Sequence, residues 1–305
     1  MRQILENEFL RVSIEDHGAE LVSVYDKENE REELWQAKPP YWNRHAPVLF
    51  PNVGKHHNDT YRLQGREFHT SQHGFARDRE FACISRTDSA LTHKLVSDED
   101  TRSYFPFDFE FHITHRLEDR KLTVEWNVVN NSGDTMYFTI GGHPGFNVPI
   151  LQGSKQTDYY LLFKEGPALK YKLVYGDSGT ADASKEYTLH LEEADGYYRC
   201  PITDHMFDRD ALIFDDTQIE WVGIGYPDGR PYVTMECEGF TNFGIWTMPG
   251  GPYICLEPWM GRCDDYGFTG DISEKPDIIS LKKEILFIRA IALLFTDKRT
   301  GLWNL

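Results

Sequence analysis

Residues 109–117 read "FEFHITHRL" and residues 121–130 read "KLTVEWNVVN", and these two stretches decide the fold. In both, apolar and polar residues alternate with a period of two, which is the pattern of a β-strand that buries one face. In the second stretch the apolar face consists of Leu122, Val124, Trp126 and Val128. Alternating runs of this kind predict antiparallel sheets that pack one face on a core and expose the other to solvent.

The same alternation recurs along the chain, for example in "FLRVSI" (9–14) and "YVTMEC" (232–237), with turn signals such as "YPDGRP" (226–231) and "MPGGP" (248–252) between the runs. No linker, internal repeat or break in composition divides the sequence. We therefore predict one domain over residues 1–305, an all-β, large antiparallel β-sandwich. Helices should be few and short, near 206–212 and after Ser273. The end, "ILFIRAIALLFTDKRTGLWNL" (285–305), lacks a clear alternating final strand.

The formal net charge of -17 argues against nucleic acid and anionic membranes as partners, because both attract cationic surfaces. The five cysteines are scattered, without the paired spacing of a zinc site, and are typical of reduced thiols. The N-terminus has acidic residues where a signal peptide needs an apolar run, and the longest apolar stretch is too short for a membrane span. We expect a cytoplasmic protein with no metal and no cofactor.

Three stretches place ionisable residues among glycine, proline and aromatic residues, where a core would hold aliphatic ones. They are "QHGFARD" (72–78) with His73, "TIGGHPGFNVP" (139–149) with His143, and "YICLEPWMGRCD" (253–264) with Glu257. Glu257 follows an apolar run beside a tryptophan, where burial raises the pKa of a carboxyl group and makes it a usable base. A histidine can supply a proton near neutral pH. Together they are the minimum set for general acid–base catalysis.

Each of these residues also has a purely structural interpretation. A histidine beside glycine is commonly a turn residue or a hydrogen-bonded core residue. Glu257, which precedes a proline, would simply end a strand with a salt bridge to Arg262. Spacing alone leaves both interpretations open.

The order of several motifs resembles the aldose 1-epimerase (galactose mutarotase-like) family, and most closely its LacX-like branch. The motifs are "PVLFPNVGKHHNDTYRLQG" (47–65), "QHGFARDREF" (72–81), "GGHPGFNVP" (141–149), "DALIF" (210–214), "GIWTMPGGPYICLEPWMG" (244–261) and the "EK" pair at 274–275. The resemblance runs from about residue 4 to residue 285. It implies a large antiparallel β-sandwich with an open sugar cleft.

The resemblance also implies roles for individual residues. Glu257 is similar to the family's base and His143 to its acid, and His73 to a second histidine that binds the sugar near its ring oxygen. Asp210 is similar to an aspartate that holds sugar hydroxyls. Lys55 stands where the family usually has arginine, which replaces a planar fork of donors with a point charge. Arg77 and Asp78 would brace the loop of His73. Independently of the resemblance, Trp246, Trp259 and Phe146 are candidates for apolar faces that contact the sugar, although Trp259 and Phe146 are residues of a kind that more commonly lies in a core.

These expectations lead to three functional hypotheses. The first is an aldose 1-epimerase, a cofactor-independent isomerase that interconverts the anomers of a free hexose such as galactose or glucose. The second is a hexose-phosphate 1-epimerase, for which Lys55, Arg44 and Arg77 supply positive charge. The third is a non-catalytic carbohydrate-binding protein, which would follow if Glu257 and His143 did not face each other. The expected partner is a small sugar, and the expected assembly is a monomer or homodimer.

Overall fold

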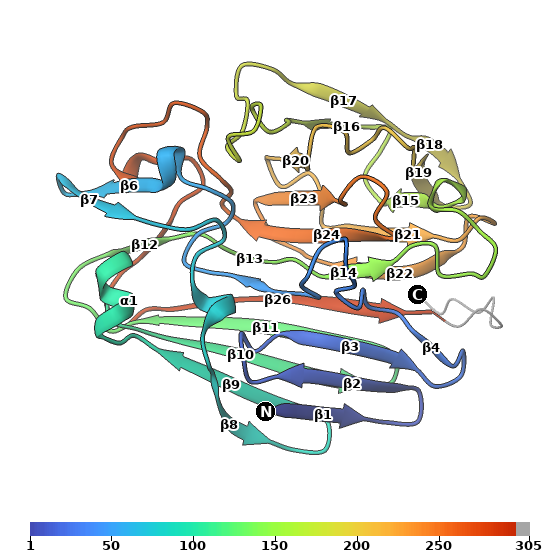
Figure 1. The fold of residues 1–305 in the computed structure, drawn as a ribbon, viewed down its shortest axis with the longest axis horizontal. Helices are drawn as coiled ribbons and strands as arrows, with labels where there is room; N and C mark the ends of the chain where they lie inside the picture. The colour runs from blue at the N-terminus through green and yellow to red at the C-terminus, as the bar shows by residue number, and fades with distance from the viewer. Residues whose placement is uncertain (297–305) are drawn as a thin grey trace.

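The computed structural model describes residues 1–296, and antiparallel strands dominate it (Figure 1). The largest sheet has ten strands. The two stretches that decide the fold pair with each other inside this sheet, in unbroken register from Phe109 opposite Asn130 to Glu118 opposite Lys121. In spatial order the strands are β18 (Glu192–Ala194), β19 (Tyr197–Pro201), β15 (Tyr160–Phe163), β21 (Trp221–Gly225), β22 (Pro231–Glu236), β26 (Leu286–Phe295), β11 (Lys121–Asn130), β10 (Phe109–Glu118), β9 (Ala90–Val96) and β8 (Ala82–Arg86).

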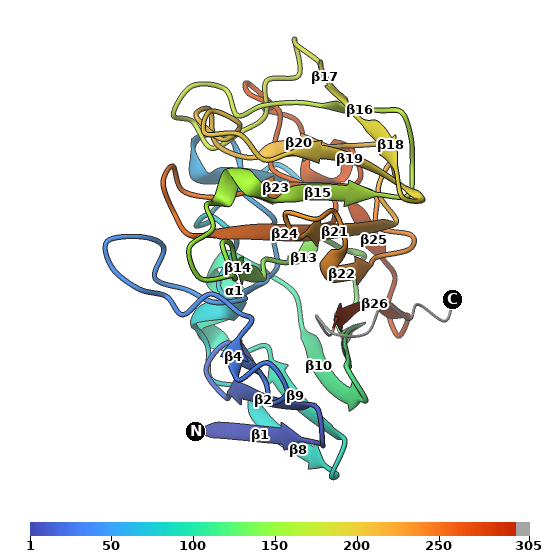
Figure 2. The same cartoon turned by 90° about the vertical axis from the view of Figure 1, so that its right-hand side faces the viewer.

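A second sheet of six strands carries most of the polar motifs described above. Its order is β20 (Leu212–Phe214), β23 (Asn242–Trp246), β24 (Tyr253–Met260), β13 (Ile140–Gly142) and β5 (Val48–Leu49), with β14 (Gly145–Asn147) also paired to β24. A third sheet, of four strands, consists of β1 (Arg2–Glu6), β2 (Leu10–Glu15), β3 (Leu21–Asp26) and β4 (Arg31–Glu32). Figure 2 shows these N-terminal strands beside β8 and β9 at the end of the molecule away from β23 and β24.

Side chains from all three sheets meet in one contiguous apolar core, for example Val12 of β2, Phe111 of β10 and Leu256 of β24. Each of these three side chains is fully buried. Burial of this kind on the inner faces of stacked sheets is the main stabilising contribution in a β-sandwich. The predicted all-β, antiparallel architecture is therefore confirmed.

The remaining elements are small. Three pairs of strands complete the sheets: β6 (Thr60–Leu63) with β7 (Arg66–His69), β12 (Met136–Phe138) with β25 (Ile279–Leu281), and β16 (Ala168–Tyr171) with β17 (Tyr187–His190). The helices in the described residues are α1 (Glu99–Tyr104) and the 3-10 turns η1 (His57–Asp59), η2 (Ala76–Asp78), η3 (Gln156–Asp158) and η4 (Ile272–Glu274). Within residues 1–296, none of the helices has the length and apolar character that a membrane span requires.

Two predictions about these elements were wrong. Residues 206–212 form turns and the start of β20, whereas the α-helix lies at α1, where Asp98 caps the first turn through Thr101. The segment after residue 285 does contain a final strand, β26, which pairs with both β11 and β22. The sequence shows no alternation here because both faces of the strand are apolar: Ile291 and Leu293 are buried, while Ile288 and Leu294 lie on the exposed side. The last part of that segment, 297–305, lies outside the described residues.

Candidate active site

The register of strand β24 brings His143 opposite Glu257. Both β13 and β14 pair with β24. The two strands are separated by residues 143–144, and their pairing with β24 keeps the same register before and after this gap. Gly141 faces Trp259 before the gap and Gly145 faces Cys255 after it. His143 lies in the gap, directly across from Glu257, so that the two side chains are a cross-strand pair on one face.

The two side chains are in contact. Nε2 of His143 lies 3.2 Å from Oε2 of Glu257, and both residues are buried, with 7% and 1% of their surfaces exposed. Glu257 does not pair with Arg262, which instead binds Asp215 and Asp265 at 2.8 Å each. Glu257 also lies inside β24 and not at its end. The strand-end interpretation of Glu257 is therefore wrong.

Burial shifts the pKa values of this pair in opposite directions. It raises the pKa of Glu257 well above its usual range, the negative charge of Asp210 adds to the rise, and the indole N–H of Trp259 opposes it. Burial lowers the pKa of His143 to about 3, helped by the positive charge of Arg77. Because the groups touch, they titrate as a unit that keeps one proton over a wide pH range. The two shifts place that proton on Glu257 at rest, and the contact gives it a direct path to His143.

His73 approaches the same place from the loop after β7. The backbone N–H of Gly54 donates a hydrogen bond to Nδ1 of His73 at 3.0 Å, and the backbone N–H of His73 donates to the Gly54 carbonyl at 2.8 Å. Burial, followed by the charges of His143 and Arg77, lowers the pKa of His73 well below its usual range. The ring is therefore neutral with its proton on Nε2, which makes that atom a hydrogen-bond donor.

Gly74 explains why the loop of His73 can approach so closely. Its φ is +69°, and a Cβ at this position would lie 2.3 Å from the carbonyl oxygen of Phe50. Only glycine tolerates both conditions. His73 itself has a φ of 67°, so the loop holds a non-glycine residue in the left-handed region beside the cleft.

The side chains surround a cleft of about 370 Å³. Six of the seven residues predicted as site residues line it: His73, Arg77, His143, Asp210, Glu257 and Trp259. A hollow of about 620 Å³ adjoins this cleft and shares Gln72, Asp210 and Trp246 with it. Lys55, the seventh predicted residue, lines this adjoining hollow and pairs with Asp59 at 3.4 Å.

Two arginines line one wall of the cleft. Nη2 of Arg77 donates to the Gln72 carbonyl at 2.6 Å, and Nη2 of Arg44 lies 2.8 Å from Asp78. Burial, together with the charge of Arg44, lowers the pKa of Arg77 to about 10. These contacts agree with the predicted bracing role of Arg77 and Asp78.

Aromatic rings form the floor and rim. The ring of Trp259 lies across Gly244 of the neighbouring strand, where a Cβ would be 2.2 Å from it. Trp42, which the sequence analysis missed, stacks on His143 with ring centroids 4.6 Å apart. Trp246 meets His143 edge-on at 5.6 Å. Phe146 is fully buried and packs against Phe295, so the core interpretation of this residue is correct and the sugar-facing one is wrong.

One group of side chains at the site has the chemistry to hold a metal ion. Ligand atoms of His143, Cys255 and Glu257 all lie within 4.8 Å of one another. Imidazole, thiolate and carboxylate are the ligands that zinc accepts. Burial and the proximity of Glu257 raise the pKa of the Cys255 thiol well above its usual value, which disfavours the thiolate that zinc would need.

The "EK" pair has a structural role below the cleft. Lys275 binds Asp264 at 2.5 Å, and Asp264 also contacts Nδ1 of His56 at 3.1 Å. All three residues are buried. The backbone N–H of His57 donates to the other oxygen of Asp264 at 2.8 Å, so this cluster fixes the segment that follows Gly54.

Comparisons with known proteins agree with this architecture. The family model described as aldose 1-epimerase matches residues 1–219. The chromosomal protein LacX of Lactococcus lactis subsp. lactis is 30% identical over 281 residues, which cover 90% of this chain and 92% of that protein. Among solved structures, a galactose mutarotase related enzyme from Lactobacillus acidophilus is 33% identical with a TM-score of 0.88, and the match covers 97% of this chain and 98% of that chain.

A galactose mutarotase-like protein from Lactobacillus casei ATCC 334 is 29% identical with a TM-score of 0.87, and the match covers 97% of this chain and 100% of that one. The Lactobacillus acidophilus structure matches over the same extent of the chain. The fold is thus that of the galactose mutarotase-like proteins, as the sequence resemblance implied. The chain belongs to the aldose 1-epimerase family.

Proposed function

We propose that the protein is an aldose 1-epimerase that interconverts the α and β anomers of a free hexose by general acid–base catalysis. The observation that carries this proposal is the contact of 3.2 Å between His143 and Glu257. Opening a sugar ring requires removal of a proton from the anomeric hydroxyl and delivery of a proton to the ring oxygen. Both oxygens are bonded to the same carbon, so the base and the acid must themselves lie close together.

The single proton of the pair serves this exchange after it has moved. The opposite pKa shifts place it on Glu257 at rest, and its transfer across the 3.2 Å contact gives the productive form, in which Glu257 is a carboxylate and His143 is protonated. Glu257 takes the proton of the anomeric hydroxyl as His143 gives its proton to the ring oxygen, and the bond between the anomeric carbon and the ring oxygen breaks. The open-chain aldehyde rotates, and closure on its other face returns both protons. The pair ends with one proton, as it began.

Other residues would bind and orient the sugar. Nε2–H of neutral His73 is a donor for a sugar oxygen, and Asp210 offers a carboxylate to sugar hydroxyls. The rings of Trp42, Trp246 and Trp259 supply apolar surface for the C–H bonds of the sugar. A cleft of about 370 Å³ falls in the range of small-molecule sites. Every step uses side chains of the chain itself, so we propose no cofactor.

A hexose phosphate is the second candidate, because Arg44 and Arg77 line the cleft. Their charge is partly offset by Asp78, which binds Arg44 at 2.8 Å and lies 3.8 Å from Arg77. The net charge of -17 also repels an anionic substrate at long range. These two facts favour the free sugar. A purely sugar-binding function is less favoured, because the base and acid do face each other.

Polarimetry on freshly dissolved α-D-glucose, α-D-galactose and glucose 6-phosphate tests the proposal. We expect the protein to accelerate mutarotation of at least one free sugar above the spontaneous rate, with a larger kcat/KM than for the phosphate. A phosphate turned over more than tenfold better than the free sugars would establish the second candidate. Binding of the sugars without any acceleration would leave only the binding function.

A further inference from the structure

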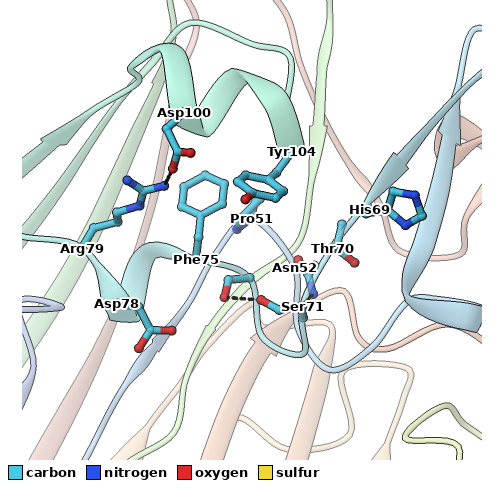
Figure 3. A pocket seen from close by; sticks show the side chains of 11 residues that line it. Pro51, Asn52, His69, Thr70, Ser71, Phe75, Asp78, Arg79, Asp100 and Tyr104 are labelled. Carbon is cyan, nitrogen blue, oxygen red and sulfur yellow. Dashed lines mark hydrogen bonds and ion pairs between the residues drawn. The ribbon is translucent and has the colours of Figure 1, made fainter.

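A second hollow lies behind the loop that holds His73. It has a volume of about 460 Å³, within the range of small-molecule sites (Figure 3). None of the residues that line it also lines the cleft. The loop 71–79 forms the wall between them. Gln72, His73 and Arg77 of this loop line the cleft, whereas Ser71, Phe75 and Arg79 line the second hollow.

The inner wall of this hollow holds two polar atoms without partners. Asn52 is 3% exposed and uses its Nδ2 to donate to the carbonyls of Gly54 and Ser71, at 2.9 and 3.0 Å. Within residues 1–296 its Oδ1 has no hydrogen-bond partner, and neither has the buried Oγ1 of Thr70. A buried polar atom without a partner costs stability, so both atoms favour a ligand that supplies hydrogen bonds. Oδ1 of Asn52 is an acceptor and requires a donor such as a hydroxyl group.

The charged residues at the rim are already paired. Arg79 binds Asp100, and Asp78 binds Arg44 at 2.8 Å. The Arg79–Asp100 pair is drawn at the edge of the hollow in Figure 3. Each carboxylate of the wall thus has a guanidinium partner, and the remaining side chain of the lining that titrates near neutral pH is the imidazole of His69. An uncharged ligand is therefore favoured over an anion or a cation.

Apolar surface faces the polar wall. Figure 3 shows the rings of Phe75 and Tyr104 side by side on one side of the hollow, with Asn52, Thr70 and Ser71 on the other. A ligand that fits has an apolar face and several hydroxyl groups. We propose that this hollow binds a neutral polyhydroxylated molecule of monosaccharide size, at a second site one loop away from the cleft. This inference does not depend on the proposed catalytic function.

The test is a titration of the deuterated, ¹⁵N-labelled protein with D-glucose, in which the chemical shifts of the backbone amides are followed by NMR. We expect two groups of amides to move with two different affinities, one around His143 and Glu257 and one around Thr70 and Tyr104. In Thr70→Val the partnerless hydroxyl is lost at nearly constant shape, and in Tyr104→Ala the exposed ring is lost. Each should weaken the second affinity about 3- to 10-fold. The first affinity should not change.

The matched control is Tyr25→Ala. Tyr25 lies on β3 and does not line the hollow, and its exposed fraction of 37% is similar to the 43% of Tyr104. This variant should leave both affinities unchanged. The proposal fails if the amides around Thr70 and Tyr104 do not move with D-glucose, or if Tyr25→Ala weakens the second affinity as much as Tyr104→Ala does. It also fails if inorganic phosphate moves those amides at a lower concentration than D-glucose, because the ligand class would then be anionic.

Discussion

A single methyl group at Gly244 should damage both the stability of the protein and its catalysis. Gly244 lies on β23 directly opposite Glu257, and the ring of Trp259 covers it. A Cβ there would lie 2.2 Å from Cζ2 and 2.3 Å from Cη2 of that ring. Carbon atoms in contact are about 3.5–4.0 Å apart. In Gly244→Ala the tryptophan or the strand must therefore move by about 1 Å.

The magnitude follows from this overlap. Overpacking of a well-packed interior costs about 1–3 kcal/mol, so the free energy of unfolding should fall by that amount in a urea titration with an unchanged m-value. The displaced ring adjoins Glu257, and a misplacement of about 1 Å near reacting groups costs about 10²-fold. We therefore expect polarimetric kcat to fall about 10- to 100-fold per folded molecule.

Gly133→Ala is the matched control, because a Cβ there meets no atom within 4 Å. The same chemical change should then leave the free energy of unfolding within about 0.5 kcal/mol of the original value and kcat unchanged. The reasoning is refuted if Gly244→Ala is as stable and as active as Gly133→Ala. Loss of stability with full activity would show that Trp259 does not position Glu257.

Three further results are expected. Because burial raises the pKa of Glu257 and lowers that of His143 to about 3, the pair takes up a second proton only near pH 3, and kcat/KM should show no acid limb in the usual imidazole range. An acid limb there would contradict the shared proton. Burial would raise the pKa of Asp264, but His56 and Lys275 hold it below its usual range. The stability that Asp264 contributes is thus present above about pH 4 and lost as the pH falls below that value. Lys275→Met removes its buried partner and should lower the free energy of unfolding by about 3 kcal/mol at pH 7. An unchanged urea midpoint in this variant would refute the role of Lys275. Activity should survive EDTA, and loss restored by one divalent ion would assign a metal to the site.

Much of the fold could be predicted because its signal is local. The alternation in 109–130 appears as β10 and β11, whose buried and half-buried residues follow the predicted period of two. β26 was missed because residues on its exposed face, such as Ile288 and Leu294, are as apolar as those on its buried face. Periodicity reports a difference between faces, so it vanishes where both are apolar.

The site was predicted only in part for a related reason. His143, His73 and Glu257 stand out among glycine, proline and aromatic residues, and motif order connects them. Trp42 lies in a loop without a motif, and its stacking on His143 follows from the three-dimensional fold alone. The contact between Glu257 and His143 depends on the register of β24 with β13 and β14, which residue spacing does not encode.

The most direct test of the central claim is polarimetric kcat for Glu257→Gln, His143→Asn and the double variant, each beside a thermal melt. Glutamine keeps the shape of Glu257 but cannot accept the anomeric proton, so kcat should fall about 10²–10⁴-fold with little change in KM. His143→Asn should have a similar effect, and the double variant should be barely worse than the poorer single one, because the two groups act as a unit. A folded Glu257→Gln protein with kcat near that of the unmodified protein would contradict the mechanism.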